Sequence, residues 1–292
     1  MILSEGGRVF FTDIHPGRGK DTRAELADQF GEERVDWAEH DVTDTDQWRE
    51  VWGRAENFFG GPVEALVNNA GIYETYQSTN TDIINVNLLG VTLGSSLALE
   101  KMSVRQGGSG GLIVQVASMA GLVTTSASPL YCASKAGVVS YVRSHGLDGR
   151  DGSVRMVAIC PSLTDTPLVR SYYHSRPLLT LIFREALHLR EGAQLTSQYG
   201  MRSLTAEEVA AGVQRTVVSG APGSVLIIYP GLSFYWHDTR LTLFNLYCLA
   251  SRALLELGVV EPVETRQMTA LLLSGLALLL YLSHILLSCA GV

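Results

Sequence analysis

The chain has few cysteines, few lysines and no stretch of like charge. Its 292 residues carry 22 Lys and Arg against 29 Asp and Glu, a formal net charge of −7, so there is no basic surplus to neutralise nucleic-acid phosphates. The four cysteines lie far apart, with no Cys-x-x-Cys pair and no cluster of histidines. This spacing indicates neither a disulfide framework nor a metal site, and it fits a reducing compartment best. We therefore expect no nucleic-acid partner and no metal.

The two ends of the chain differ in hydropathy. Residues 1–7 contain no basic stretch followed by an apolar one, so no signal peptide is indicated. Residues 268–292 contain no Asp, Glu, Lys or Arg, and at about 1.5 Å per residue they are long enough to cross a hydrocarbon core of about 30 Å. A buried core helix or a dimer-interface helix is the alternative, but such helices are seldom apolar on all sides. We expect a membrane anchor here, with the rest of the chain on the cytosolic side.

Short β-branched runs alternate with longer helical patterns from residue 1 to about 230. This alternation is typical of β-α-β units around a parallel sheet, and the apolar strands indicate helices on both faces. The predicted strands are 8–12, 35–39, 65–68, 112–117, 154–160 and 225–229, and the predicted helices are 17–30, 44–59, 80–105, 131–148 and 205–219. The fold class is therefore α/β, a Rossmann-like doubly wound parallel sheet followed by a C-terminal apolar helix.

Residues 163–202 interrupt the alternation with many aromatic and aliphatic side chains and no clear strand. An insertion this apolar is more typical of a lid than of a solvated loop. We divide the chain into a sheet domain over 1–238, an amphipathic connector over 239–267 and the transmembrane anchor over 268–292.

Polar residues follow two of the predicted strands, at the edge where parallel sheets bind their ligands. Asn69, Ala70 and Gly71 follow the third strand, although a polar loop explains this turn equally well. Ser118 closes the fourth strand. Its hydroxyl can donate to a substrate oxygen, and the alternative is that it merely ends the strand.

Tyr131 and Lys135 are four residues apart on a predicted helix, so their side chains share one face. An ammonium near a phenol favours phenolate and lowers a pKa that starts near ~10, as proton exchange with an alcohol requires. This spacing often occurs by chance. Here, however, Lys20 and Lys101 are the only other lysines in a chain that otherwise uses Arg.

The order of these motifs resembles the short-chain dehydrogenase/reductase family. The motifs are the Asn-Asn-Ala-Gly turn, Asn87 in Asn-Leu-Leu-Gly, Ser118, Tyr131-x-x-x-Lys135 and a turn after a strand at Pro161. The resemblance covers about residues 1–238. Within the family, the runs at 101–122, 129–144 and 158–166 are most similar to the NAD-dependent 15-hydroxyprostaglandin dehydrogenases.

The resemblance implies a role for each catalytic position. Tyr131 would be the general acid and base, and Ser118 would hold the substrate oxygen. Lys135 would bind the nicotinamide ribose and lower the pKa of Tyr131. Asn87 would support a water in the proton relay.

The resemblance also implies the cofactor. Asp13 follows the first strand, where a carboxylate accepts hydrogen bonds from ribose hydroxyls and repels a 2′-phosphate, so NAD is favoured over NADP. Asp41 and Val42 match the family's pair beside the adenine, and Thr166 matches the threonine that contacts the carboxamide. The expected cofactor-binding set is completed by Asn69, Ala70, Gly71, Tyr131, Lys135 and Pro161.

The sequence departs from the family pattern at its beginning. The family's first strand and its Thr-Gly-x-x-x-Gly-x-Gly turn, which hold the pyrophosphate, have no counterpart in the 292 residues. We interpret this as a missing first β-α unit. Because that strand is central in the usual strand order, its loss is expected to separate the first two predicted strands from the others. Ser128 also stands where the prostaglandin enzymes carry a Gln.

Two functions follow as hypotheses. The first is an NAD-dependent oxidoreductase that interconverts a secondary alcohol and a ketone on a lipophilic substrate, which the apolar insertion and the anchor favour. The second is a catalytically impaired, membrane-tethered pseudoenzyme that serves as an interaction module. A homodimer is a further partnership that the sequence neither predicts nor excludes.

Overall fold

The computed structural model describes residues 2–73, 80–124, 128–148, 152–174, 203–230 and 232–236. The chain divides into two compact units, residues 1–236 and 237–292, and the second lies wholly outside the described residues. The predicted connector and the predicted anchor at 268–292 therefore lie outside them too. So does most of the apolar insertion, of which residues 175–202 are not described.

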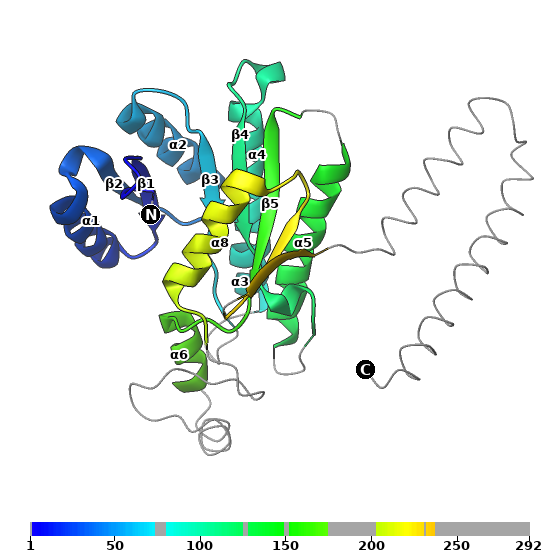
Figure 1. Cartoon of the computed structure of the whole chain (residues 1–292). Helices are drawn as coiled ribbons and strands as arrows, with labels where there is room; N and C mark the ends of the chain where they lie inside the picture. Colours follow the sequence, from blue (N-terminus) through cyan, green and yellow to red (C-terminus); the bar gives the residue numbers. More distant parts are fainter. Residues whose placement is uncertain are drawn as a thin grey trace, which may run out of the picture. The chain divides into compact units, whose positions relative to one another are not determined.

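Strands and helices alternate through the first unit (Figure 1). The strands are β1 (Val9–Asp13), β2 (Val35–Glu39), β3 (Ala65–Asn68), β4 (Gly111–Val116), β5 (Val154–Pro161), β6 (Val225–Tyr229) and β7 (Leu232–Trp236). The helices are α1 (Pro16–Phe30), α2 (Thr45–Phe59), α3 (Asn80–Ile84), α4 (Val91–Met102), α5 (Pro129–Asp148), α6 (Pro167–His174) and α8 (Ala206–Ser219). The helix predicted over 80–105 is interrupted by a π-helical turn at Asn85–Gly90. β7 was not predicted.

The strands form two separate sheets. β1 and β2 pair in parallel, and β3, β4, β5, β6 and β7 form a second sheet in that order. All neighbours in the second sheet are parallel except β6 and β7, which are antiparallel. The prediction that the first two strands would be separated from the rest is therefore confirmed.

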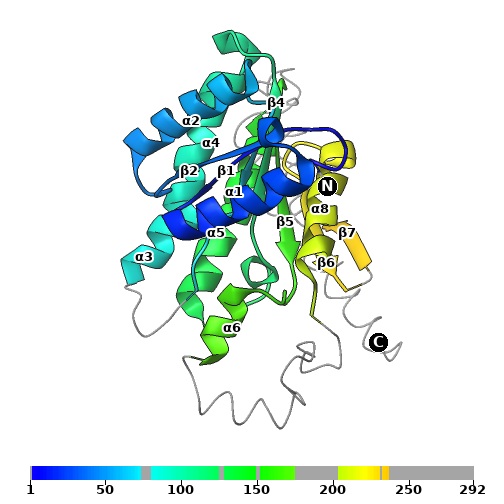
Figure 2. The same ribbon diagram turned by 90° about the vertical axis from the view of Figure 1, so that its left-hand side faces the viewer.

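Side chains of the larger sheet alternate between two apolar layers, because successive residues of a strand point to opposite faces. Ile113 and Met156 belong to a cluster that α2, α4 and α5 cover, while Leu112 and Val157 belong to a cluster that α8 covers. Figure 2 shows α2 and α4 side by side on their layer. Helices on both faces confirm the doubly wound arrangement for this sheet.

The smaller sheet has a core of its own and a contact with the larger one. Leu3, Ala27 and Val35 are its buried residues, whereas Phe10 of β1 packs against the cluster beneath α2. The guanidinium of Arg8 donates to the backbone carbonyls of Phe58 and Phe59 at the end of α2. The β1–β2 sheet is thus held through α2.

Among the described residues, one helix is long and apolar enough to cross a membrane, Thr81–Met102. Its residues Val91, Leu97, Ala98 and Met102 are buried in the core cluster, and its α4 portion contacts β3 and β4. A core helix of this kind meets the same criteria of length and composition. We therefore assign it to the core of the sheet domain.

Candidate active site

Three neighbouring strands of the larger sheet end at the same edge. β3, β4 and β5 are parallel neighbours, and the carboxyl ends of such strands form the ligand site of open α/β sheets. Asn69 follows β3, Ser118 lies just beyond β4, and Pro161 is the last residue of β5. α5 carries Tyr131 and Lys135 in its first turns. Asn69 and its neighbour Ala70 are exposed, as a ligand contact requires.

Tyr131 is buried and its phenol lies in hydrogen-bonding contact with the Ser118 hydroxyl. Burial raises the pKa of Tyr131, and the contact with Ser118 opposes this increase without cancelling it. Desolvation of the phenolate is thus the largest effect on the pKa of Tyr131, and the lowering by Lys135 that the resemblance implies stays a prediction. At neutral pH Tyr131 is a protonated phenol.

Lys135 lies beside Tyr131 and is only 3% exposed. Its Nζ is 5.8 Å from the centre of the Tyr131 ring and donates to the Val116 carbonyl at 2.8 Å. Burial lowers the pKa of Lys135 to about 8. Gly71 lies against this group: a Cβ there would be in ordinary contact with Nζ at 3.5 Å and closer to Asn87 Oδ1, at 3.3 Å. Cys160, whose pKa burial raises to about 12, is a neutral thiol here.

Asn87 sits in the π-helical turn and is fully buried. Its Oδ1 accepts from the Ile72 amide at 2.8 Å, and its Nδ2 donates to the Ile72 carbonyl at 2.9 Å and to Ser134 Oγ at 3.1 Å. Ser134 in turn donates to the Tyr131 carbonyl. The Asn87 side chain therefore ties the turn after β3 to α5. Its role in supporting a water stays a prediction.

A buried polar network that the sequence did not predict holds the base of the site. Asn68 Nδ2 donates to Gln115 Oε1 at 2.9 Å and to Ser95 Oγ at 3.2 Å. Gln115 Nε2 donates to the same Ser95 hydroxyl at 2.6 Å. All three side chains are buried, and buried amides with satisfied partners fix geometry. The first Asn of the Asn-Asn-Ala-Gly turn is thus a structural residue that joins β3, β4 and α4.

The expected ribose-binding carboxylate has a basic neighbour. Asp13 ends β1, and its Oδ1 accepts from the His15 amide at 2.7 Å and from Arg18 Nη2 at 3.4 Å. Arg18 belongs to α1 and is exposed. Arg18 was not predicted as part of the site, because a residue at the start of a helix approaches a strand end only once the chain has folded.

Asp41 and Val42 follow β2 and are positioned by the start of α2. Asp41 Oδ1 accepts from the amide and the hydroxyl of Thr43, and the Asp41 amide donates to Gln47 Oε1 at 2.8 Å. Val42 lies against the π-helical turn: a Cβ at Gly90 would be 3.0 Å from the Val42 carbonyl oxygen. This contact links the end of the smaller sheet to the turn that carries Asn87.

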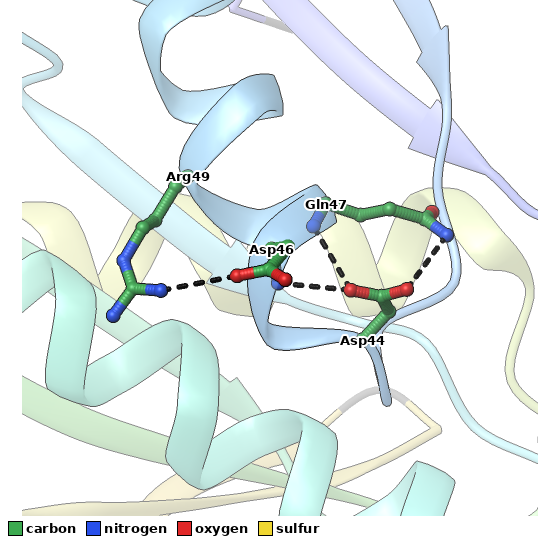
Figure 3. A network of polar contacts seen from close by, with 4 residues as sticks. All are labelled: Asp44, Asp46, Gln47 and Arg49. Atoms are coloured by element: carbon green, nitrogen blue, oxygen red, sulfur yellow. Dashed lines mark hydrogen bonds and ion pairs between the residues drawn. The ribbon is translucent and has the colours of Figure 1, made fainter.

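The Asp44 side chain caps α2 beside this segment (Figure 3). Its Oδ1 accepts from the amides of Asp46 and Gln47, and its Oδ2 accepts from Gln47 Nε2. The two backbone donors are the main reason that the pKa of Asp44 is lowered from its usual value. Gln47 therefore bridges the cap and Asp41.

We expect Asp44→Ala to lower the midpoint of thermal unfolding by about 2 to 4 °C, because two amide donors of α2 lose their acceptor. Asp44→Asn keeps a capping oxygen and should recover most of the loss. Asp46→Asn is the matched control, since the ion pair of Asp46 with Arg49 is exposed (Figure 3) and such pairs contribute little. An equal shift for Asp46→Asn would contradict the capping role. Calorimetry or circular dichroism measures all three.

The segment after β5 carries the remaining expected residues. Pro161 is buried, and Thr166 is partly buried with its hydroxyl 3.4 Å from the Thr164 carbonyl. Asp165 forms a two-pronged ion pair with Arg170, which lowers the pKa of that carboxyl. The Asp165 amide also donates to the Leu204 carbonyl at 2.9 Å. This hydrogen bond joins the segment in which the apolar insertion begins, at Asp165, to the residue that follows soon after its end, Leu204.

The expected residues fall into two groups. Ser118, Tyr131, Lys135, Asn87 and Gly71 come together at the edge of the larger sheet. Asp13 and Asp41 come together at the edge of the smaller one, where the His40 amide donates to the Asp13 carbonyl at 3.1 Å. The first group holds an acid–base pair and a hydroxyl donor, which suits proton transfer to or from an alcohol. The second offers a carboxylate to a polyhydroxy ligand.

The chain belongs to the short-chain dehydrogenase family, whose model, described as short chain dehydrogenase, matches residues 1–177. The chain is 34% identical over 172 residues to the 15-hydroxyprostaglandin dehydrogenase [NAD(+)] of Bos taurus, a match that covers 58% of this chain and 64% of that protein. The human enzyme of the same name matches to the same extent. The chain thus spans about 64% of the length of these relatives.

Other relatives carry a different name. A 3-alpha-(or 20-beta)-hydroxysteroid dehydrogenase of Mycobacterium tuberculosis is 36% identical over 173 residues, which covers 57% of this chain and 63% of that protein. Among solved structures, ElxO with NADP bound superposes with a TM-score of 0.61 at 25% identity, over 78% of this chain and 89% of that one. These likenesses confirm the resemblance to hydroxyprostaglandin dehydrogenases and the α/β fold.

Proposed function

We propose that the protein interconverts a secondary alcohol and a ketone on a lipophilic small molecule, with NAD as the cofactor. The observation that carries this proposal is the contact of Ser118 with Tyr131 beside Lys135, at the edge where three parallel strands end. The relatives named for alcohol oxidation support it. The anchor expected at 268–292 supports a lipophilic substrate.

The residues at this edge divide the chemistry between them. A bound nicotinamide dinucleotide supplies the acceptor or donor of hydride. Tyr131 gives a proton to the ketone oxygen during reduction and takes the alcohol proton during oxidation, while Ser118 holds the same oxygen by a hydrogen bond. Because burial raises the pKa of Tyr131, the protonated phenol is the resting form, which favours reduction at neutral pH. Oxidation requires the phenolate and should quicken as pH rises.

The residues suit the two riboses of the cofactor but not its pyrophosphate. Asn69 and Ala70 are exposed, and we expect them to contact the nicotinamide ribose together with Lys135, while Asp13 is expected to contact the adenosine ribose. The pyrophosphate has no matching turn, since the 292 residues contain no Thr-Gly-x-x-x-Gly-x-Gly. For activity tests we therefore define an extended form, in which a strand–turn–helix unit with this turn precedes Met1.

The experiment is to supply the extended form with NAD and lipophilic secondary alcohols and to follow formation of the reduced nicotinamide. Turnover that depends on the alcohol is the expected result. An extended form that binds NAD but turns over no secondary alcohol and no ketone would overturn the proposal.

Asp13 is expected to set the choice between NAD and NADP. In Asp13→Ala the repulsion of a 2′-phosphate disappears, and Arg18, which lies 3.4 Å from the carboxylate, becomes free to bind that phosphate. We expect the affinity for NADP relative to NAD to rise roughly tenfold. The double change Asp13→Ala with Arg18→Ala should lose most of this gain. Equal affinities for the two cofactors in the unchanged extended form would contradict the preference for NAD.

We also propose that residues 268–292 anchor the protein in a membrane with the catalytic domain on the cytosolic side. Each apolar residue of a spanning helix favours insertion by a few tenths of a kcal/mol, and no charged residue opposes it here. The full chain should stay with membranes in high salt and in alkaline carbonate, and a chain that ends at Pro262 should be released. A full chain that is soluble without detergent would overturn this proposal.

A further inference from the structure

A second tyrosine lies against the catalytic one. The rings of Tyr73 and Tyr131 have their centres 4.4 Å apart with 38° between their planes, within the range of favourable aromatic pairs. Tyr73 belongs to the segment after β3, and Tyr131 begins α5. Tyr131 is buried, whereas Tyr73 is only half-buried. Tyr73 therefore contributes to burying the catalytic ring and is itself only partly covered.

Two anchors fix the position of Tyr73. Its phenol accepts a hydrogen bond from Ser128 Oγ at 2.6 Å, and Ser128 is fully buried. On the other side, the Asn87 amide group holds both the amide and the carbonyl of Ile72, the residue before Tyr73. The ring is thus restrained through its hydroxyl and through its backbone. A ring restrained from both ends costs little further entropy when a ligand packs on it.

We propose that Tyr73 determines substrate specificity by forming an aromatic wall beside the reacting carbon, so that the site prefers alcohols and ketones with a flat unsaturated group there. This inference rests on the proposed function, because it takes Tyr131 as the group that reaches the substrate oxygen. A substrate whose oxygen contacts Tyr131 and Ser118 places the neighbouring carbon atoms next to Tyr73. Aromatic pairs gain about 0.5–1.5 kcal/mol beyond burial, which is about a two- to tenfold preference in affinity.

Ser128 holds the hydroxyl end of the Tyr73 ring that forms the proposed wall. Ser128 stands where the prostaglandin enzymes carry a Gln, and its hydroxyl donates to the Tyr73 phenol. Ser128 therefore acts on the substrate through Tyr73 as a positioning residue. The two side chains are 55 residues apart in the sequence.

The test compares two ketones of the same skeleton, acetophenone and methyl cyclohexyl ketone, which differ in whether the ring is flat and unsaturated. Their affinities for the full chain are measured by NMR on isotope-labelled tyrosine, with the Tyr131 signal assigned from Tyr131→Phe. This measurement requires no turnover and no cofactor. We expect acetophenone to bind about two to ten times more tightly and to shift the Tyr73 and Tyr131 signals.

Four variants separate the contributions. Tyr73→Leu keeps an apolar side chain without a flat ring and should remove the preference for acetophenone. It should also lower the pKa of Tyr131, because the Tyr131 phenol is then less buried. Tyr73→Phe keeps the ring and should keep the preference. Ser128→Ala should weaken it by loosening the ring. Tyr235→Phe is the control and should change nothing, because it removes a phenol of β7 whose contact is with Ser219 at the end of α8.

Equal affinity for the two ketones in the unchanged protein would overturn the inference, and so would a preference that survives in Tyr73→Leu. Binding of neither ketone would overturn it as well. If the aromatic preference depends on Tyr73 but the extended form oxidises no alcohol, the proposed function fails while the assignment of Tyr73 stands. The two failures are therefore distinguishable.

Discussion

Tyr131→Phe should lower the rate of alcohol oxidation by the extended form by about 10² to 10⁴, the usual contribution of a positioned acid or base. The expected loss is confined to the chemical step, because the phenol is asked only to move a proton. The ring remains to pack on Tyr73 at the same place in the core. Steady-state turnover and direct titration with NAD give the two quantities, and NAD affinity should stay within about twofold of the unchanged protein.

Two further variants make this prediction specific. Ser118→Ala removes the hydroxyl in contact with the phenol and should also slow the reaction, by about 10²-fold or more, because an oxygen-holding donor is lost. Tyr229→Phe removes a phenol from β6 and should leave turnover unchanged. Comparable turnover in Tyr131→Phe and the unchanged protein would contradict the proposed role of Tyr131 as the acid and base.

Much of the fold is encoded in local sequence pattern. The runs from Val154 to Cys160 and from Val225 to Tyr229 are short, β-branched and apolar on both faces, so they predict buried parallel strands, and the structure has β5 and β6 there. β7 was missed because Leu232–Trp236 is a single short run after a Pro-Gly pair. Its strand character depends on pairing with β6, which no local signal reports.

Site residues whose roles follow from the order of motifs were predictable. Those whose roles depend on contacts between distant segments were less predictable. Tyr131 and Lys135 share a helix face by spacing alone, and Ser118 follows a strand end. The pair of Tyr73 and Ser128 arises only when two distant segments meet. The burial that raises the pKa of Tyr131 was not predictable either, because the sequence shows the spacing to Lys135 but not how deeply the phenol is buried.

The 292-residue chain should bind NAD far more weakly than the extended form. Charge-assisted hydrogen bonds from turn amides at a helix N-terminus hold the pyrophosphate in this family. The loss of two such bonds, at about 1.5 to 3 kcal/mol each, corresponds to roughly 10² to 10⁴ in affinity. The division into two sheets should lower the affinity for NAD further, because no strand among the described residues pairs with both β1 and β3. Asp13 ends β1 of the smaller sheet, whereas Lys135 lies on α5, which packs on the larger sheet.

Calorimetric titration of NAD against both forms measures the difference, and one control separates its two causes. An extended form in which alanines replace the turn glycines restores the strand without the close approach of backbone amides to the phosphates. If phosphate contacts dominate, this control should bind NAD almost as weakly as the 292-residue chain. If the separation of Asp13 from Lys135 dominates, it should bind nearly as well as the full extension. Micromolar binding by the 292-residue chain itself would mean that another segment holds the pyrophosphate.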